Sequence, residues 1–289
     1  MKTRHILAIS TVTLLLLLYA GMSVYLSRLA AREIQNELAN LCDVADVSFG
    51  RVSLGPVRRH LRVRNIRVFP AESAMDFSIE RLTVRRFDRG SEFPHYLSLS
   101  LHGVRIDPLQ LGDYPFIAGL AYDQPLSFNL ELDYRSNAER RELNIRRLAI
   151  EADGVGRLQG RIQLGNLQLD SGIFYNLPGN YRQLMLREVS LRYEDDSLLQ
   201  RMINAEAYVI GIEPEFNRNA IIAALNSQMA GEQDAFIAAA LSEALAFVEN
   251  PEVINVTIAP PRPQPLERII RSHNFADLIN LLEIKLATR

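Results

Sequence analysis

An eight-residue pattern recurs along the first two thirds of this 289-residue chain, with apolar residues at its first, third, sixth and eighth positions. A spacing of two is the period of a β-strand, in which successive side chains point to opposite faces. The two-residue skip in the middle shifts that phase. Either a β-bulge absorbs the shift, or the strand turns a different face inward halfway along. Copies begin at Val47, Leu61, Phe77, Leu99, Leu143, Ile162 and Leu184.

These copies predict one long, twisted, mostly antiparallel sheet with a continuous apolar face. Residues 126–134 strengthen the prediction, because apolar and polar side chains alternate there without interruption. After Tyr193 the period becomes helical. We expect a helix over 218–248 that is broken or bent near Gly231, a strand over 253–258 and a proline-rich connector. A helix in two pieces over 266–282 and a closing strand over 283–286 follow, so the fold class is mainly β with C-terminal α (α+β).

The N-terminal segment 6–26 contains no charged residue. As a helix, its 21 residues would span about 31 Å, which matches a hydrocarbon core of about 30 Å. Lys2 and Arg4 precede it and favour a cytoplasmic N-terminus. A cleaved signal peptide is the alternative, but its apolar run is normally about 7–15 residues. We therefore expect a retained single-pass anchor.

Four regions follow from these patterns. Residues 1–26 are a cytoplasmic tip and transmembrane anchor, and residues 27–43 are a juxtamembrane helix. Residues 44–193 form the β-sheet domain. Residues 194–289 form a helical C-terminal region with short strands and the proline-rich connector, expected to cap the sheet.

Charge is distributed unevenly, although the net charge is only −2 and gives no reason to expect nucleic-acid binding. Residues 51–90 hold ten arginines against four acidic residues, and residues 194–252 hold eleven acidic residues against two arginines. The acidic region is a candidate surface for a membrane-protein partner. The arginines form either a solvated strand face or a contact with phosphate-bearing lipid headgroups. The headgroup candidates are Arg58, Arg59, Arg62 and Arg64.

No catalytic or cofactor motif accompanies the strands. The five histidines lack the spacing of a helical metal pair, and Cys42 is the only cysteine. The glycines at 154, 156 and 160 are misplaced for a dinucleotide fingerprint and suit turns better. We therefore expect no enzyme activity, no metal and no cofactor.

The apolar face has two interpretations that periodicity does not separate. It is either an ordinary core that packs against helices or a second sheet, or a groove that holds acyl chains. The scarcity of helices before residue 195 favours the groove. Its candidate lining residues are Leu61, Val63, Leu99, Leu101, Phe128, Leu130, Leu132, Leu143 and Ile145.

The segments VADVSFGRVSLG, LRVRNIRVFP, FSIERLTVRR and LSLSLHGVRID, behind an N-terminal anchor, resemble the start of AsmA-like proteins. These are inner-membrane-anchored proteins of the Gram-negative envelope, related to bridge-like lipid-transfer proteins with a repeating β-groove. The resemblance covers about residues 1–193 and carries no catalytic residue. It implies a single-pass inner-membrane protein whose bulk is periplasmic and whose groove binds phospholipid or another acyl lipid. The alternative is a structural or adaptor subunit of a membrane protein complex, without a lipid ligand.

Overall fold

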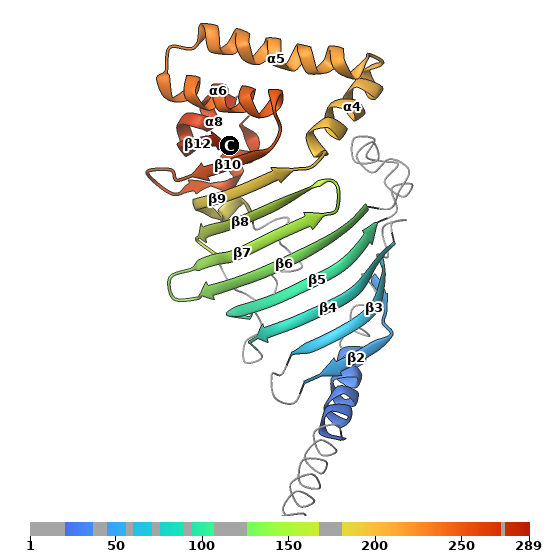
Figure 1. The fold of residues 1–289 in the computed structure, drawn as a ribbon. Helices are drawn as coiled ribbons and strands as arrows, with labels where there is room; N and C mark the ends of the chain where they lie inside the picture. The colour runs from blue at the N-terminus through green and yellow to red at the C-terminus, as the bar shows by residue number, and fades with distance from the viewer. Residues whose placement is uncertain are drawn as a thin grey trace, which may run out of the picture.

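A computed structural model describes residues 21–36, 45–55, 60–70, 76–88, 94–106, 126–167, 181–272 and 275–289. Its main feature is one 12-stranded antiparallel sheet with helices at its two ends (Figure 1). The first strands are β1 (Ala45–Ser48), β2 (Arg51–Leu54), β3 (Leu61–Pro70), β4 (Phe77–Phe87) and β5 (Tyr96–Ile106). The next are β6 (Leu126–Asn137), β7 (Glu142–Ala152), β8 (Gly156–Gly165) and β9 (Met185–Asp195).

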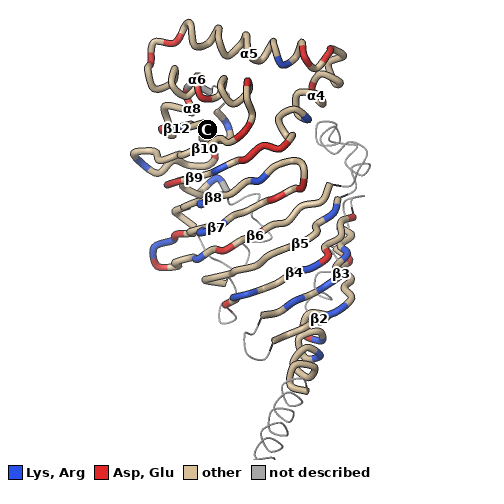
Figure 2. Tube along the Cα trace, in the orientation of Figure 1, with Lys and Arg blue, Asp and Glu red and all other residues tan. Residues whose placement is uncertain are grey.

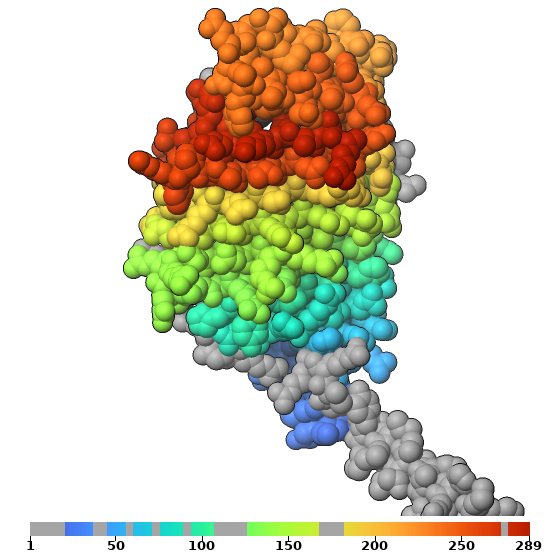
Figure 3. Space-filling view, turned by 60° about the vertical axis from the view of Figure 1, so that its left-hand side comes forward, coloured from blue at the N-terminus to red at the C-terminus, as the bar shows by residue number. Residues whose placement is uncertain are grey.

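Sequence order and spatial order agree along the sheet. From β3 to β9 each strand pairs with the next, and β10 (Val253–Ile258) and β12 (Ile284–Thr288) continue the order beyond β9. Strands β1 and β2 both lie along β3, and the short β11 (Gln264–Pro265) lies beside β9. The space-filling view shows the result as successive colour bands across one face (Figure 3). The predicted antiparallel sheet is confirmed, and it continues past residue 193 into the C-terminal region.

The C-terminal helices gather at the β12 end of the sheet (Figure 1). They are α4 (Leu198–Ile210), α5 (Pro214–Gly231), α6 (Ala235–Glu249), α7 (Leu266–Arg271) and α8 (Phe275–Leu282), with a short 3-10 turn η2 (Tyr181–Gln183) before β9. The predicted break near Gly231 is confirmed between α5 and α6. The strand at 253–258 and the two-piece helix over 266–282 are also confirmed, whereas α4 was not expected.

The skips in the repeated pattern lie at one level across the first strands. Asn65 and Gly103 adopt left-handed backbone angles, with φ of 55° and 62°. Gly50 lies against Asn65, and Gly103 lies against Glu80 of β4. In β5, His102 and Gly103 together oppose Asn129 of β6. This is a β-bulge, and it restores the strand phase after the skip.

The same solution recurs in later strands. Arg146 and Arg147 of β7 oppose Arg161 of β8, and Arg187 of β9 is an extra residue opposite β8. Both halves of β3 turn their apolar side chains to the same face of the sheet. Val63, before the skip, and Ile66, after it, lie in one buried cluster. A bulge is therefore the correct interpretation of the skip in β5, β7 and β9, whereas in β3 the left-handed Asn65 restores the phase without a register shift against β4.

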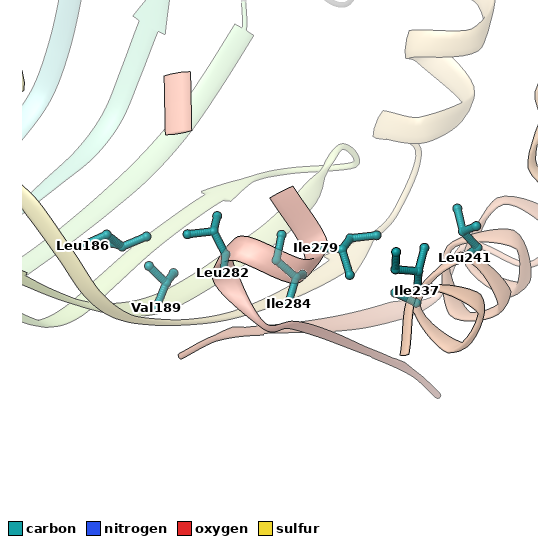
Figure 4. Packing of buried hydrophobic residues seen from close by; sticks show 8 residues of the cluster. Leu186, Val189, Ile237, Leu241, Ile279, Leu282 and Ile284 are labelled. Carbon is teal, nitrogen blue, oxygen red and sulfur yellow. The ribbon is translucent and has the colours of Figure 1, made fainter. Parts of the chain in front are cut away.

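Two hydrophobic cores hold the sheet, one at each end. The first joins β3, β4 and β5 through Val63, Ile66, Ile79 and Val104, with Ile34 of the helical segment 21–36 packed against it. The second joins β9 and β12 to α6 and α8 (Figure 4). Its most buried side chain, Ile279, is fully enclosed. The others labelled there are Leu186, Val189, Ile237, Leu241, Leu282 and Ile284.

At each end of the sheet, helix side chains form hydrogen bonds with the edge strand. At the β2 end, the N–H of Leu54 donates to Ser27 Oγ (2.8 Å), and Ser23 Oγ donates to the Leu54 carbonyl (3.4 Å). At the β12 end, the N–H and hydroxyl of Thr288 both donate to Glu243 Oε2 (2.7 and 2.6 Å). Unpaired backbone groups on an edge strand otherwise recruit foreign strands. These contacts satisfy edge groups that β3 and β10 do not reach.

The membrane span expected at 6–26 falls mostly outside the described residues, which begin within its last turns. Residues 21–36 are helical. In the part of the chain that is described, no helix combines the length and the apolar character needed to cross a membrane. Helical structure in 27–36 agrees with the first part of the expected juxtamembrane helix.

We predict that Gly103→Ala destabilises the fold by about 1–2 kcal/mol, the usual cost of a left-handed conformation for a residue with a Cβ. The added Cβ would also lie 3.0 Å from Glu80 Cβ. Gly55→Ala is the control, because no atom lies within 4 Å of its Cβ position. That control should change stability by less than about 0.5 kcal/mol in denaturant titration. Equal losses in both variants would contradict the role given to the bulge.

A second prediction concerns pH. The hydrogen bonds from Thr288 lower the pKa of the Glu243 carboxyl below its ordinary value of 4.5. A lowered folded-state pKa stabilises above the unfolded pKa, and this contribution is lost as pH falls through the folded value. The unfolding midpoint of the parent should therefore fall towards that of Glu243→Gln as the pH is lowered from about 6 to about 3. A difference between the two proteins that stays constant across this range would show that the Glu243 charge contributes nothing.

Candidate functional site

The groove candidates share one face of the sheet. Cross-strand register places Leu99 opposite Leu132, Leu101 opposite Leu130, and Ile145 opposite Ile162 of β8. Directly opposed residues in adjacent strands point to the same side. Because Ile162 packs against the C-terminal core and Leu101 against the N-terminal core, one apolar face runs between the two.

The middle of that face differs from its ends. Four candidates, Leu61, Val63, Leu101 and Phe128, belong to the core beside segment 21–36. The other five lie in neither buried cluster and are only half-buried: Leu99, Leu130, Leu132, Leu143 and Ile145. The described helices stand at the ends of the sheet rather than over β5 to β7 (Figure 1). The apolar face is thus core at both ends and partly accessible between them.

A cavity of about 890 Å³ lies where segment 21–36 meets the sheet. Its walls include Met22 and Leu26 of that segment, and Phe87 and Tyr96 at the adjoining ends of β4 and β5. Pockets of roughly 300–1,000 Å³ with mainly apolar walls are typical of small-molecule sites. Three arginines also line this cavity: Arg85, Arg86 and Arg135.

Sequence reasoning identified only Leu61 among the described residues that line this cavity. Met22 and Leu26 were assigned to the membrane span. Phe87 and Tyr96 lie outside the apolar positions of the repeat. Both aromatic side chains are exposed, at 47% and 42%, which is a signal that sequence alone does not contain.

The headgroup candidates do not share a face with the groove candidates. Arg62 and Arg64 are exposed, and they alternate along β3 with Leu61 and Val63, which pack into the core. Their side chains therefore lie across the sheet from the apolar face. Arg58 and Arg59 lie outside the described residues.

The acidic region forms the opposite end of the molecule from the arginine-rich strands (Figure 2). Part of its charge is structural. Asp195 Oδ1 accepts from the N–H of Leu199 in the first turn of α4 (3.0 Å) and from the Tyr193 hydroxyl (2.6 Å). Burial, followed by this hydrogen bond, raises the pKa of Tyr193 above its ordinary value. Asp195 therefore satisfies a free N–H at the N-terminus of α4, where the helix dipole also favours a negative charge.

An exposed apolar corner joins α4 to α5. Tyr208 is 88% exposed, and Val209, Ile210 and Phe216 are more than half exposed. The sequence patterns did not indicate this corner, because no helix was expected over 198–210. Within the described ranges, no three histidine, cysteine, aspartate or glutamate side chains converge as a metal site would require.

Comparison with known proteins gives a limited result. A family model described as "Uncharacterized protein" matches residues 149–289. No curated protein matches the chain. The matched segment begins within β7 and contains β8 to β12 and α4 to α8, so it takes in the whole helical end of the sheet.

Because the middle of the apolar face is partly accessible, a truncation there should lower the free energy of unfolding less than the same truncation in the core. Leu241 is 3% exposed in the C-terminal core, and Leu241→Ala should cost about 2–5 kcal/mol. Leu132→Ala removes the same atoms from a half-buried position and should cost less than half as much. Unfolding midpoints of the two variants in one buffer provide the comparison. Equal costs would mean that the middle of the face is packed as tightly as the core.

Proposed function

We propose that this chain is a membrane-anchored protein of the Gram-negative envelope whose apolar sheet face binds the acyl chains of lipids. In this role it supports envelope lipid transport or homeostasis. The observation that carries the proposal is the half-buried row Leu99, Leu130 and Leu132, which continues two cores without belonging to either. Contiguous apolar surface that a fold leaves accessible commonly marks an interaction site or a ligand-binding groove.

The cavity beside segment 21–36 supports the same function. Met22 and Leu26 belong both to its wall and to the last turns of the apolar segment 6–26. A lipid that leaves a bilayer alongside this helix would meet the cavity first and the apolar strands next. The resemblance of residues 1–193 to AsmA-like proteins supports an inner-membrane anchor with the sheet in the periplasm.

The positions of the arginines change how the headgroup is expected to bind. One lipid cannot place its acyl chain on the apolar face and its headgroup on Arg62 or Arg64, because the sheet separates them. Arg85, Arg86 and Arg135 line the cavity itself, beside Met22 and Leu26, and are the better headgroup contacts. Phospholipid, or another acyl lipid with an anionic headgroup, fits this arrangement.

Site-specific photo-crosslinking tests the proposal on the full chain. A benzophenone amino acid at Leu130 should give lipid adducts, detected by mass spectrometry, when cells that express the protein are irradiated. The same amino acid at Ser127 is the matched control, since Ser127 is exposed on the other face of the same strand. Adducts at both positions, or at neither, would contradict lipid binding on the apolar face.

A second candidate function is a structural or adaptor subunit of a membrane complex. The exposed corner of Tyr208 and Phe216, next to Glu213 and Glu215, favours it. Aromatic side chains of this kind are enriched in protein interfaces. Protein adducts from a benzophenone at Tyr208, with no lipid adduct at Leu130, would favour this function.

A further inference from the structure

A row of cationic side chains crosses the polar face of the sheet. Arg51 of β2 lies directly opposite Arg64 of β3, and Arg64 lies directly opposite Arg81 of β4. His102 of β5 continues the row opposite Arg81. Directly opposed residues have Cβ atoms about 4.5–5.5 Å apart. The three arginine side chains therefore extend from adjacent backbone positions on the same face.

No acidic side chain neutralises this row among the described residues. Arg51, Arg64 and Arg81 form no ion pair there, and neither does Arg62. Glu80 precedes Arg81, but its carboxylate is directed to the Gly103 backbone and also forms no ion pair. Like charges placed directly opposite each other destabilise a sheet. The fold therefore maintains a repulsion that a bound anion would relieve.

Some arginines at the centre of the sheet, unlike those in this row, have acidic partners. Glu131 forms ion pairs with Arg85 (3.3 Å) and Arg147 (2.8 Å), and Glu151 pairs with Arg157. Arg85, Arg147 and Arg157 thus have acidic partners, whereas Arg51, Arg64 and Arg81 have none among the described residues. Positive charge accumulates at the end nearest segment 21–36 (Figure 2).

A hollow of about 750 Å³ lies over the boundary between these two zones. Its described walls hold five arginines against two glutamates, so the hollow is cationic even after every glutamate is paired. Thr83 and Ser100, opposed across β4 and β5, add two hydroxyl donors. Its charged walls are Arg62, Arg81, Arg85, Arg147, Arg157, Glu131 and Glu151, with His60 and His102 beside them.

We propose that this hollow, together with the Arg51–Arg64–Arg81 row, binds a phosphate group on the polar face of the sheet. Guanidinium forks match the oxygens of a phosphate and stay charged at any physiological pH. Adjacent arginines and hydroxyls can donate to one tetrahedral anion from several directions. The phosphate belongs either to a lipid headgroup or to a free anion. The site lies across the sheet from the acyl-binding face. It shares Arg85 with the cavity beside segment 21–36, but Arg64 and Arg81 do not line that cavity, so a test at these two residues does not depend on the function proposed above.

Calorimetric titration of the full chain in nonionic detergent with inorganic phosphate tests the site. Ionic strength is held constant with chloride, so that general screening does not change during the titration. The parent should bind saturably. Arg64→Gln/Arg81→Gln should weaken binding at least about tenfold, because each removes a charge-assisted donor. This double variant should also unfold at an equal or higher temperature than the parent, since it removes the repulsion between the opposed guanidinium groups.

The matched control is Arg140→Gln/Arg182→Gln, which removes the same charge from two exposed arginines that have no recorded ion pair. Its phosphate affinity should stay within about twofold of the parent. No saturable binding by the parent, or equal weakening in both double variants, would overturn the proposal. Leu130→Asp should leave phosphate affinity unchanged, which separates this site from the acyl-binding proposal.

Two short-chain lipids identify the source of the phosphate. Dihexanoyl phosphatidic acid carries a phosphate monoester, and dihexanoyl phosphatidylcholine carries a headgroup without net charge. Phosphatidic acid binding tighter than inorganic phosphate would assign the site to lipid headgroups. Equal affinity of the two would assign it to a free anion. Phosphatidylcholine binding as tightly as phosphatidic acid would overturn a site built on uncompensated charge.

Discussion

The alignment of left-handed residues and bulges across neighbouring strands is the constraint on which this sheet depends. Without the left-handed turn at Asn65 and the extra residue at Gly103, the second halves of β3 and β5 would turn their apolar side chains to the polar face. Because the irregularities lie side by side, hydrogen bonding resumes in step on both sides of them. A single apolar face then extends over strands ten or more residues long.

The ends of this face are closed, and the closure explains why its centre is the candidate site. Helical segment 21–36 covers the β2 end and α6 covers the β12 end, each contributing both apolar packing and a hydrogen bond to an edge strand. Edge pairing with another chain is thereby discouraged at both ends. The remaining accessible apolar surface lies between the two cores, on β5 to β7.

Much of the fold was predictable from sequence because it is encoded locally. Period-two alternation located the long strands except β8, and proline, glycine and asparagine located the helix breaks. The turns expected at Gly156 and Gly160 were wrong, because both glycines lie within β8, where Leu191 and Tyr193 of β9 approach them closely. The functional geometry was less predictable, because it is non-local. Arg64 is recognisable as a solvated strand residue, but only the register shows that Arg51 and Arg81 flank it. The cavity likewise joins Met22 to Tyr96, which are remote in sequence.

A sheet that is one layer thick presents two chemically opposite surfaces to the same surroundings. In the β3 sequence LRVRNIRV, leucine, valine and isoleucine lie on one side and arginine on the other, with the phase restored at Asn65. The proposed acyl-chain and phosphate sites therefore lie on opposite faces of the same strands, where the two ligands do not touch each other. Coupling between them would have to pass through the sheet backbone. A substitution on one face that leaves binding on the other unchanged is thus the natural expectation for this architecture.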